Sequence, residues 1–482
     1  MQRLRRPTPR AAIVAAAVLG GLAVRAWILT SPLSALDSDE AIVGLMAQHA
    51  LRGEFTVLYW LNNYGGPHEA WLTAVVFAAL GSSTLALKLT TLALFAVGAL
   101  LIWRVGLRTV ASPAAELAAA LFWVAPAYLV WWTTKARGFY AFGLVAELVV
   151  LLLALRLRQR DSRLDAVGLG LAFGLGFWAN PEVLVVALPA LAWLAWQRPR
   201  ALRLTWLALP AFVLAVSPWL AWNARNNWLS LDLRSVAGER STYTGRLTDL
   251  FRVVWPTWLG VRVPFSLDWL LGAAVGIVVV AASLVGLALL VRSRPPRLGV
   301  LILIAVAFPF LYAASSFAFF VAEPRYLVLF SPVPALLLAW FLGRYPWPVA
   351  ASTLAAVFAL SLGGLVRMEH ERLYEPLGPH VASATDISPL IELLRREHVD
   401  RVLADYWIAY RLNFETHERV LATSTGFVRD QHADRIVRAS AWPAHVFVRG
   451  TPMELRARRR LERRGYRRLT TEDFSVYVHR QL

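Results

Sequence analysis

Acidic and histidine side chains are concentrated in one polar stretch near the start of the chain, residues 34–69. In a chain that is 58% hydrophobic, this is the densest group of side chains able to exchange protons. Carboxylates next to a long apolar segment are costly to desolvate unless a partner or a reaction uses them. The stretch therefore predicts acid–base or binding chemistry beside a membrane. Its members are Asp37, Asp39, Glu40, His49, Glu54, His68 and Glu69.

The run Asp37-Ser38-Asp39-Glu40 also has a structural interpretation. Ser38 or Asp39 could cap the helix that follows, because acidic and hydroxyl side chains stabilise the N-terminal end of a helix. The two interpretations are compatible, since a cap fixes where a catalytic carboxylate points. The histidines at 49 and 68 match no known metal-binding spacing. We expect no cofactor and no metal site, with a divalent metal left open.

Cations precede two later apolar segments. Lys135 and Arg137 lie in WWTTKARGFY, and Arg325 and Tyr326 lie in AEPRYLVLF. An anionic lipid phosphate would explain these residues, because arginine binds phosphate through two parallel hydrogen bonds and tyrosine can donate a third. The structural alternatives are headgroup contacts for the first pair and a local Glu323–Arg325 ion pair for the second.

The composition is that of a membrane protein. Of the 482 residues only 17% are charged, and the mean hydropathy is +0.52. The formal charge of +18 could indicate nucleic acid, but the arginines occur in short clusters between apolar runs, as cytoplasmic loops require. We therefore expect a lipid bilayer and no nucleic acid as partner. Cysteine is absent, so an exported domain would fold without disulfides.

Apolar runs of about 20 residues predict membrane spans. The segment 67–81 is shorter, and placing it along the outer surface puts the basic clusters on the inside. The first run is long for a signal peptide, so we expect a retained helix, with cleavage near Ala35 as the alternative. The eleven expected spans are 11–30, 84–103, 113–131, 138–156, 164–179, 182–197, 202–222, 267–291, 298–320, 325–343 and 347–366.

The tail, residues 367–482, has an ordinary soluble composition. Apolar patterns alternate between helix and strand, which favours a small α/β domain. Expected helices cover 387–399, 407–414 and 454–466, and expected strands cover 401–406, 418–423, 445–450 and 474–480. The predicted fold class is mostly α: a polytopic bundle of about eleven spans with outer-face juxtamembrane helices and this small C-terminal domain. The bundle would cover 1–366, with outer loops at 31–83 and 223–266, and the exported domain 367–482.

These features, in this order, resemble the GT-C glycosyltransferases of the protein O-mannosyltransferase and aminoarabinose-transferase type. The likeness consists of an Asp-Glu pair in the first outer loop (Asp39, Glu40) and a surface helix with an aromatic residue near its start (Pro67 to Trp71). It continues with an outer-face Arg137, a PRYL segment opening a late span (Pro324 to Leu327) and an exported C-terminal domain.

The resemblance implies transfer of a sugar from a polyprenyl-phosphate donor to an acceptor. It implies that Asp39 serves the acceptor, with Glu40 beside it, and that Arg137 and Arg325 hold the donor phosphate; we add Lys135 and Tyr326 to this phosphate site. We also expect His68, Glu69 and Asn63 to contact the acceptor or the sugar. Many relatives carry Lys-Pro-Pro where this chain has Gly65-Gly66-Pro67, so the sugar stays open.

The expected function is thus an inverting membrane glycosyltransferase of the plasma membrane, with its active site and C-terminal domain on the outer face. The acceptor, whether protein, lipid or glycan, is not indicated. A transporter or flippase of lipid-linked sugars is the alternative; it predicts repeated halves and ionisable groups near the bilayer centre, for which Arg25 and Glu147 are the candidates. A sensor or scaffold with an exported domain would leave the loop carboxylates unexplained.

Overall fold

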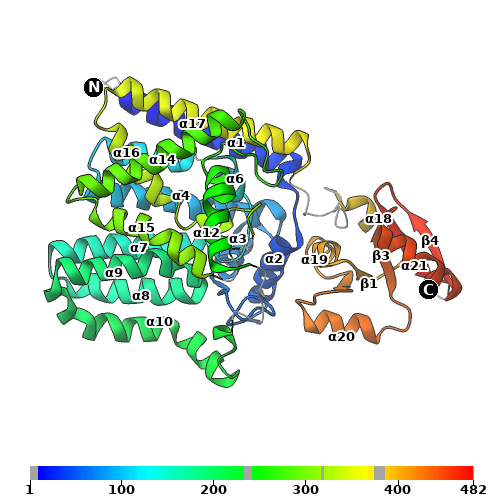
Figure 1. Ribbon diagram of the computed structural model, residues 1–482. Coiled ribbons are helices and arrows are strands. Elements are labelled where there is room, and N and C mark those ends of the chain that lie inside the picture. Colours follow the sequence, from blue (N-terminus) through cyan, green and yellow to red (C-terminus); the bar gives the residue numbers. More distant parts are fainter. Residues whose placement is uncertain are drawn as a thin grey trace, which may run out of the picture.

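The computed structural model describes residues 9–124, 126–232, 241–315, 318, 320–373 and 386–480. Figure 1 shows two parts: a large bundle of helices, and a small domain in orange and red that contains the β-sheet. The helix α2 (Ser38–Leu51) lies between them, beside α19 (Tyr406–Glu415) of the small domain. The polar stretch of the sequence is therefore placed where the two parts meet.

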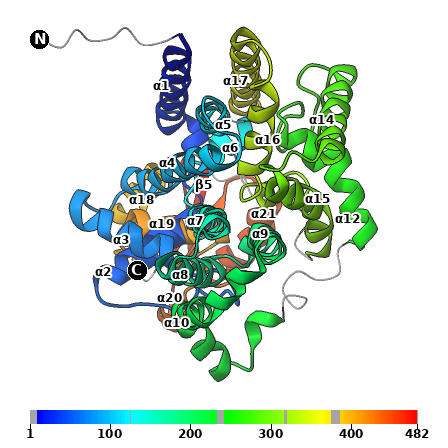
Figure 2. The same ribbon diagram turned by 90° about the vertical axis from the view of Figure 1, so that its left-hand side faces the viewer.

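Within these ranges, six helical segments are long and apolar enough to cross a membrane, and five apolar segments are shorter. Figure 2 looks along several of them. The exact count of eleven spans stays a prediction. The long segments are α1 (Pro9–Thr30), α4 (Thr84–Thr109), α7 (Tyr140–Gln159), α10 with the turn before it (Pro199–Arg225), α14 (Ala273–Ser293) and α17 (Trp347–His370). The shorter segments are α3 (His68–Leu80), α5 (Ala114–Trp123), α9 with its preceding turn (Pro181–Gln197), α15 (Gly299–Ala314) and α16 (Pro332–Leu342).

Two expected spans are broken in ways that matter for the site. The expected span 113–131 consists of α5 and the separate α6 (Ala127–Trp132), with Pro126 at the N-cap of α6. Proline has no backbone N–H, so Pro126 cannot continue the hydrogen-bond pattern of α5 and instead precedes the first residue of α6. The expected span 325–343 is a 3₁₀ turn (Arg325–Leu327) followed by α16. The second break places Arg325 in a turn outside regular α-helix, whereas Arg137 lies in the turn between α6 and α7.

The remaining helices complete the bundle. α8 (Arg163–Ala179) packs between α7 and α10. The predicted outer loop 223–266 is partly helical, with α12 (Tyr243–Asp249), a π-helical turn (Leu250–Val254) and α13 (Trp255–Trp258); its residues 233–240 lie outside the described residues.

The C-terminal domain has a five-stranded sheet with the order β2-β1-β3-β5-β4. β1 pairs in parallel with β2 and β3, whereas β5 pairs antiparallel with β3 and β4. The predicted α/β character is confirmed, but β4 and α20 were not expected from the sequence. The strands are β1 (Arg401–Ala404), β2 (Leu421–Ser424), β3 (Ala444–Val448), β4 (Tyr466–Thr470) and β5 (Phe474–His479), and the other helices are α18 (Ser388–Arg396), α20 (Gln431–Ala439) and α21 (Pro452–Arg463).

The helix α19 lies along α2 in the same direction and joins the domain to the bundle. At one end the Ser38 hydroxyl donates to the Tyr406 carbonyl at 2.6 Å, and at the other His49 Nε2 lies 2.8 Å from Glu418. Between them, a Cβ at Gly44 would lie 2.3 Å from the Phe414 ring, so only glycine permits this close approach. The two helices therefore pack closely along most of their length.

The His49–Glu418 contact predicts that docking depends on pH. Burial lowers the pKa of His49, but Glu418 and Glu54 outweigh it and raise this pKa above its ordinary value of about 6.5. Protonated His49 therefore stabilises the docked domain fully below about pH 6.5, and the contribution is lost as pH rises through the raised pKa. We expect the difference in thermal unfolding midpoint between wild type and His49→Gln to shrink from pH 6 to pH 9. A pH-independent difference would contradict this role.

Candidate active site

The N-terminus of α2 is fixed by a reciprocal cap between Asp37 and Glu40. Asp37 Oδ1 accepts a hydrogen bond from the Glu40 backbone N–H at 3.1 Å, and the Asp37 N–H donates to Glu40 Oε2 at 3.4 Å. This capping box satisfies two N–H groups at the helix start. The cap is thus Asp37, and the expected caps, Ser38 and Asp39, lie in the first turn instead. The Asp39 side chain is 31% exposed and can meet a ligand.

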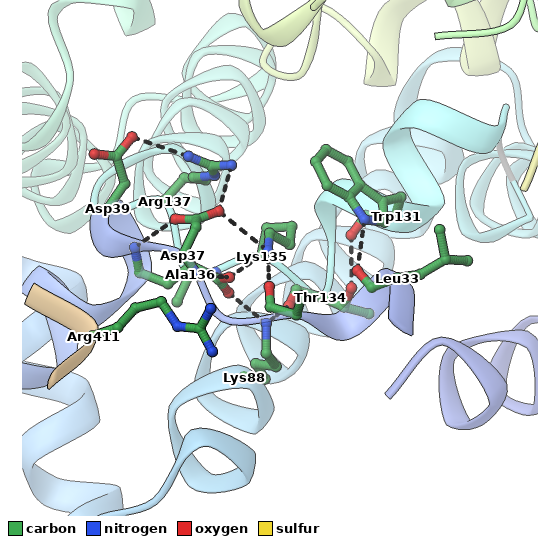
Figure 3. Close-up of polar contacts among 12 residues, drawn as sticks. Leu33, Asp37, Asp39, Lys88, Trp131, Thr134, Lys135, Ala136, Arg137 and Arg411 are labelled. Atoms are coloured by element: carbon green, nitrogen blue, oxygen red, sulfur yellow. Dashed lines mark hydrogen bonds and ion pairs between the residues drawn. The ribbon is translucent and has the colours of Figure 1, made fainter. Parts of the chain in front are cut away.

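Glu40 is enclosed by the two lysines of the chain. Its Oε1 lies 2.6 Å from Lys88 Nζ, and its Oε2 pairs with Lys135. All three side chains are at most 2% exposed. Lys88 comes from α4 and Lys135 from the turn after α6, and Figure 3 shows them converging below the start of α2. The cluster therefore ties three segments together, and Glu40 does not reach solvent.

Backbone groups satisfy the rest of this cluster. Lys135 Nζ donates to the Ala35 carbonyl at 2.7 Å, and Lys88 Nζ donates to the Thr134 carbonyl at 3.2 Å. The Ala136 N–H donates to Glu40 Oε1 at 3.0 Å. Buried charges are tolerated when they are paired and hydrogen-bonded in this way. The arrangement favours a structural role for Glu40 and Lys135, and the catalytic and phosphate-binding roles expected of them stay predictions.

Arg137 links the buried cluster to Asp39 (Figure 3). Its Nη2 is 2.7 Å from Asp37 Oδ2, and its Nη1 donates to Asp39 Oδ2 at 3.0 Å. Burial alone would raise the pKa of Asp37, but Arg137 and Lys135 hold it well below its ordinary value. Burial lowers the pKa of Arg137, and the carboxylates of Asp37 and Asp39 more than reverse this. Both groups are therefore charged at neutral pH, and three carboxylates face three cations here.

Asp39 and Arg137 line a cavity of about 670 Å³. Arg325 and Tyr326 line the same cavity, so the structure brings together the two arginines expected to hold a phosphate, which are far apart in sequence. The helical bundle and the C-terminal domain both contribute. The lining residues are Asp39, Tyr59, Asn62, Tyr64, Trp132, Arg137, Phe139, Tyr140, Asn180, Pro181, Glu182, Leu184, Val185, Leu311, Ser315, Phe320, Arg325, Tyr326, Tyr406, Trp407, Phe427 and Arg429.

Three arginines of this lining each keep one donor unused. The Nε atoms of Arg137, Arg325 and Arg429 are buried and have no hydrogen-bond partner among the described residues. Arg325 does form the local ion pair with Glu323, at 3.2 Å, and its guanidinium lies 4.0 Å from the Phe320 ring centre. The ion pair with Glu323 that was expected as the structural role of Arg325 is therefore present, but it does not involve the Nε atom. Unpaired buried donors are costly, and an oxyanion in the cavity would satisfy them.

The three residues expected to contact the acceptor or sugar do not belong to the lining as described. His68 is buried among aromatic rings, stacked on Phe142 at 4.6 Å and edge-on to Trp178 at 4.4 Å. Glu69 is buried and accepts from the Thr91 hydroxyl at 2.7 Å. Asn63 lies outside the cavity, whereas its neighbour Asn62 lines it. Their proposed contacts with substrate therefore have no support in this geometry.

Sequence reasoning missed the lining residues of the C-terminal domain and one carboxylate. The carboxylate is Glu182, which lies in the 3₁₀ turn Pro181–Val183 and lines the cavity. Tyr406, Trp407, Phe427 and Arg429 follow Asp39 by more than 360 residues, and no local pattern marks them. In the described part of the chain, no three His, Cys, Asp or Glu side chains are grouped to hold a metal. The expectation of metal-independent chemistry stays a prediction.

Known families and structures give an independent comparison. Residues 65–222 match the model of the dolichyl-phosphate-mannose-protein mannosyltransferase family. No curated protein sequence matches. ArnT from Cupriavidus metallidurans, bound to undecaprenyl phosphate, superimposes with a TM-score of 0.67 at 12% identity, covering 97% of both chains. In its apo state the TM-score is 0.62 at 14% identity, covering 95% of this chain and 98% of that one.

A second protein of similar fold is the archaeal oligosaccharyltransferase AglB from Archaeoglobus fulgidus, in complex with an inhibitory peptide and a dolichol-phosphate. Its TM-score is 0.53 at 12% identity, covering 98% of this chain and 74% of that one. At these identities the structures establish the fold alone, and they do so over nearly the whole chain. The family match over residues 65–222 and this shared fold agree with the resemblance to the GT-C glycosyltransferases drawn from the sequence.

Proposed function

We propose that this protein transfers a sugar from a polyprenyl-phosphate donor to an acceptor hydroxyl at the outer face of the plasma membrane, with inversion at the anomeric carbon. The observation that carries the proposal is a single cavity that holds a partly exposed carboxylate, Asp39, together with the unpaired Nε donors of Arg137 and Arg325. A base and an anion site in one cavity are what this reaction needs.

The donor is a lipid phosphate in this proposal. The similar structures of ArnT and AglB contain undecaprenyl phosphate and a dolichol-phosphate, which supports a polyprenyl carrier here. In this chain Arg325, Tyr326 and Arg137 would face the phosphate. Burial lowers the pKa of Arg325, but Glu323 and nearby tyrosines raise it well above its ordinary value, so the guanidinium keeps its charge. Fixed cations of this kind stabilise negative charge that grows on a leaving group.

The reaction would be a single displacement. The acceptor oxygen attacks the anomeric carbon while Asp39 accepts the hydroxyl proton. The bond between that carbon and the phosphate oxygen breaks, and its electron pair leaves with the lipid phosphate. Because the phosphate leaves as a stabilised anion, no second carboxylic acid is required to protonate it, in contrast to glycoside hydrolysis.

The outer-face location follows from the charge distribution. With α3 at the membrane surface, the basic clusters of the bundle fall on one side and the C-terminal domain on the other. A reporter fused to the end of the chain should be active outside the cytosol; cytosolic activity would reverse this topology.

The decisive experiment measures transfer rather than translocation. Purified protein in nanodiscs is incubated with undecaprenyl phosphate carrying radiolabelled hexoses, pentoses or aminopentoses, and with an envelope extract as acceptor. We expect the label to leave the lipid for a new product, with release of undecaprenyl phosphate. If no label is transferred in nanodiscs, and the labelled lipid instead crosses the membrane of proteoliposomes that contain the protein, the protein is a flippase.

Loss of Arg325 should weaken the donor site. Removing a charge-assisted phosphate contact costs about 1.5–3 kcal/mol, so Arg325→Ala should raise the donor KM or lower turnover by about tenfold or more. The matched control is Arg344→Ala, which removes an arginine that lies over the Trp340 ring and outside the cavity lining. Equal effects of the two variants on donor KM would contradict a phosphate site at Arg325.

A further inference from the structure

The Asp39 carboxylate is held by groups from both parts of the molecule. On the bundle side, Arg137 donates to Oδ2 at 3.0 Å. On the side of the C-terminal domain, the Tyr406 hydroxyl donates to Oδ1 at 2.6 Å. We infer that Tyr406 is a positioning residue for Asp39, so that the C-terminal domain completes the active site. This inference rests on the proposed function, because it assumes that Asp39 is the base.

Two bonds on different oxygens define the orientation of a carboxylate. A single donor would leave the group able to rotate about its last bond, whereas donors on Oδ1 and Oδ2 fix its plane. Each carboxylate oxygen can accept two hydrogen bonds, so a site remains for the acceptor hydroxyl. Catalytic groups need to be held to within a fraction of an ångström by such supporting bonds. The Tyr406 phenol thus fixes the orientation of the Asp39 carboxylate and still leaves a position on it that can accept the proton.

Tyr406 is itself held in place. Its carbonyl accepts from the Ser38 hydroxyl at 2.6 Å, in the residue next to Asp39. Its ring packs edge-on against Trp407 at 5.1 Å and Tyr410 at 5.2 Å. Burial, and then the charge of Asp39, raises the pKa of Tyr406 well above its ordinary value. The residue therefore stays a protonated donor at any physiological pH.

Contacts of Arg429 also hold the C-terminal domain against the bundle. Arg429 donates to the Trp60 carbonyl at 3.2 Å and to the Asn62 side chain, and its backbone N–H donates to the Tyr410 hydroxyl. Tyr59 lies beneath the Arg429 guanidinium, and its hydroxyl donates to the Asp39 carbonyl at 2.8 Å. Hydrogen bonds therefore hold Asp39, at the start of α2, both at its backbone carbonyl and at its side chain. A domain that was only tethered to the bundle would not need these contacts.

The test is Tyr406→Phe in the full-length protein, which removes one oxygen and keeps the ring. In the transfer assay we expect kcat to fall about tenfold or more, with an unchanged donor KM and unchanged affinity for undecaprenyl phosphate. A purely structural role would lower stability and donor binding together and would not separate kcat from KM. Tyr466→Phe, in β4 of the same domain and outside the cavity lining, is the control and should leave both constants unchanged.

The geometry can be tested without activity, because the natural chain has no cysteine. In Asp39→Cys/Tyr406→Cys a short bis-methanethiosulfonate reagent should cross-link the two positions, whereas Asp39→Cys/Tyr466→Cys should stay unlinked. Failure of the first pair to cross-link would overturn the inference, as would wild-type kcat in Tyr406→Phe. If the wild type transfers no sugar although the cross-link forms, the proposed function fails, and a role for Tyr406 in transfer fails with it.

Discussion

Asp39→Asn is expected to lower the rate of sugar transfer by about 10²–10⁴, the usual cost of removing a general base. The amide has the shape of the carboxylate but cannot take a proton from the acceptor hydroxyl. Folding should survive, because the Asp39 side chain is partly exposed and Arg137 keeps its bond to Asp37 at 2.7 Å. Affinity for undecaprenyl phosphate should also survive, since Asp39 contributes no positive charge to the phosphate site.

The measurement is single-turnover transfer by purified Asp39→Asn, together with binding of undecaprenyl phosphate. Glu182→Gln is the matched control, because Glu182 is the other acidic side chain among the described residues of this lining. We expect a much smaller effect there. Near-normal turnover of Asp39→Asn would move the base to another group, and an equally large loss in Glu182→Gln would indicate two working carboxylates and a different mechanism.

The parts of this fold that depend on local pattern are predictable from sequence. Apolar runs indicated the bundle, and alternating patterns indicated the α/β tail, because periodicity reflects which face of an element is buried. The break at Pro126 was also open to prediction, since proline has no backbone N–H with which to continue a helix. The expected span 113–131 stays a prediction, and it consists of two helices instead of one.

Only those site residues could be predicted from the sequence whose charge is unexpected beside an apolar segment. Asp39, Arg137 and Arg325 were found because each is charged beside an apolar run. Tyr406 and Arg429 could not be found, because their place depends on how the C-terminal domain docks, and nothing in RVLADY or TGFVRD reports that docking. Position in space is set by tertiary contacts such as Gly44 with Phe414, which have no local signature.

The two lysines are a sequence signal for part of this site. Lys88 and Lys135 are the only lysines in a sequence whose other basic residues are arginine or histidine. Both contact Glu40 in a space closed to solvent. An ammonium is a compact point charge, whereas a guanidinium is a broad planar fork, so lysine fits a small enclosed site where arginine does not. A lysine inside an apolar run such as TLALKLTTLAL predicts a buried acidic partner.

Glu40→Gln is therefore expected to reduce the free energy of unfolding by about 3–5 kcal/mol, the range for breaking a buried ion pair by removing one partner. The substitution leaves the buried Lys88 ammonium without a carboxylate partner, and it removes one of the two carboxylates at Lys135, which keeps Asp37 at 3.2 Å. It also weakens the capping box, because an amide oxygen is a poorer acceptor for the Asp37 N–H. The measurement is chemical unfolding in detergent, read by tryptophan fluorescence, with Asp39→Asn as the matched control for loss of a nearby charge.

A double variant separates structure from catalysis at this position. In Glu40→Gln/Lys88→Met one lysine charge is removed along with the carboxylate, so the loss of stability should be smaller than the sum of the two single changes, as coupled neighbours require. The folded fraction of Glu40→Gln should then transfer sugar far faster than Asp39→Asn. If instead Glu40→Gln unfolds like the wild type and has lost transfer, the catalytic role expected from the Asp-Glu pair belongs to Glu40, and the buried cluster is part of the chemistry rather than its support.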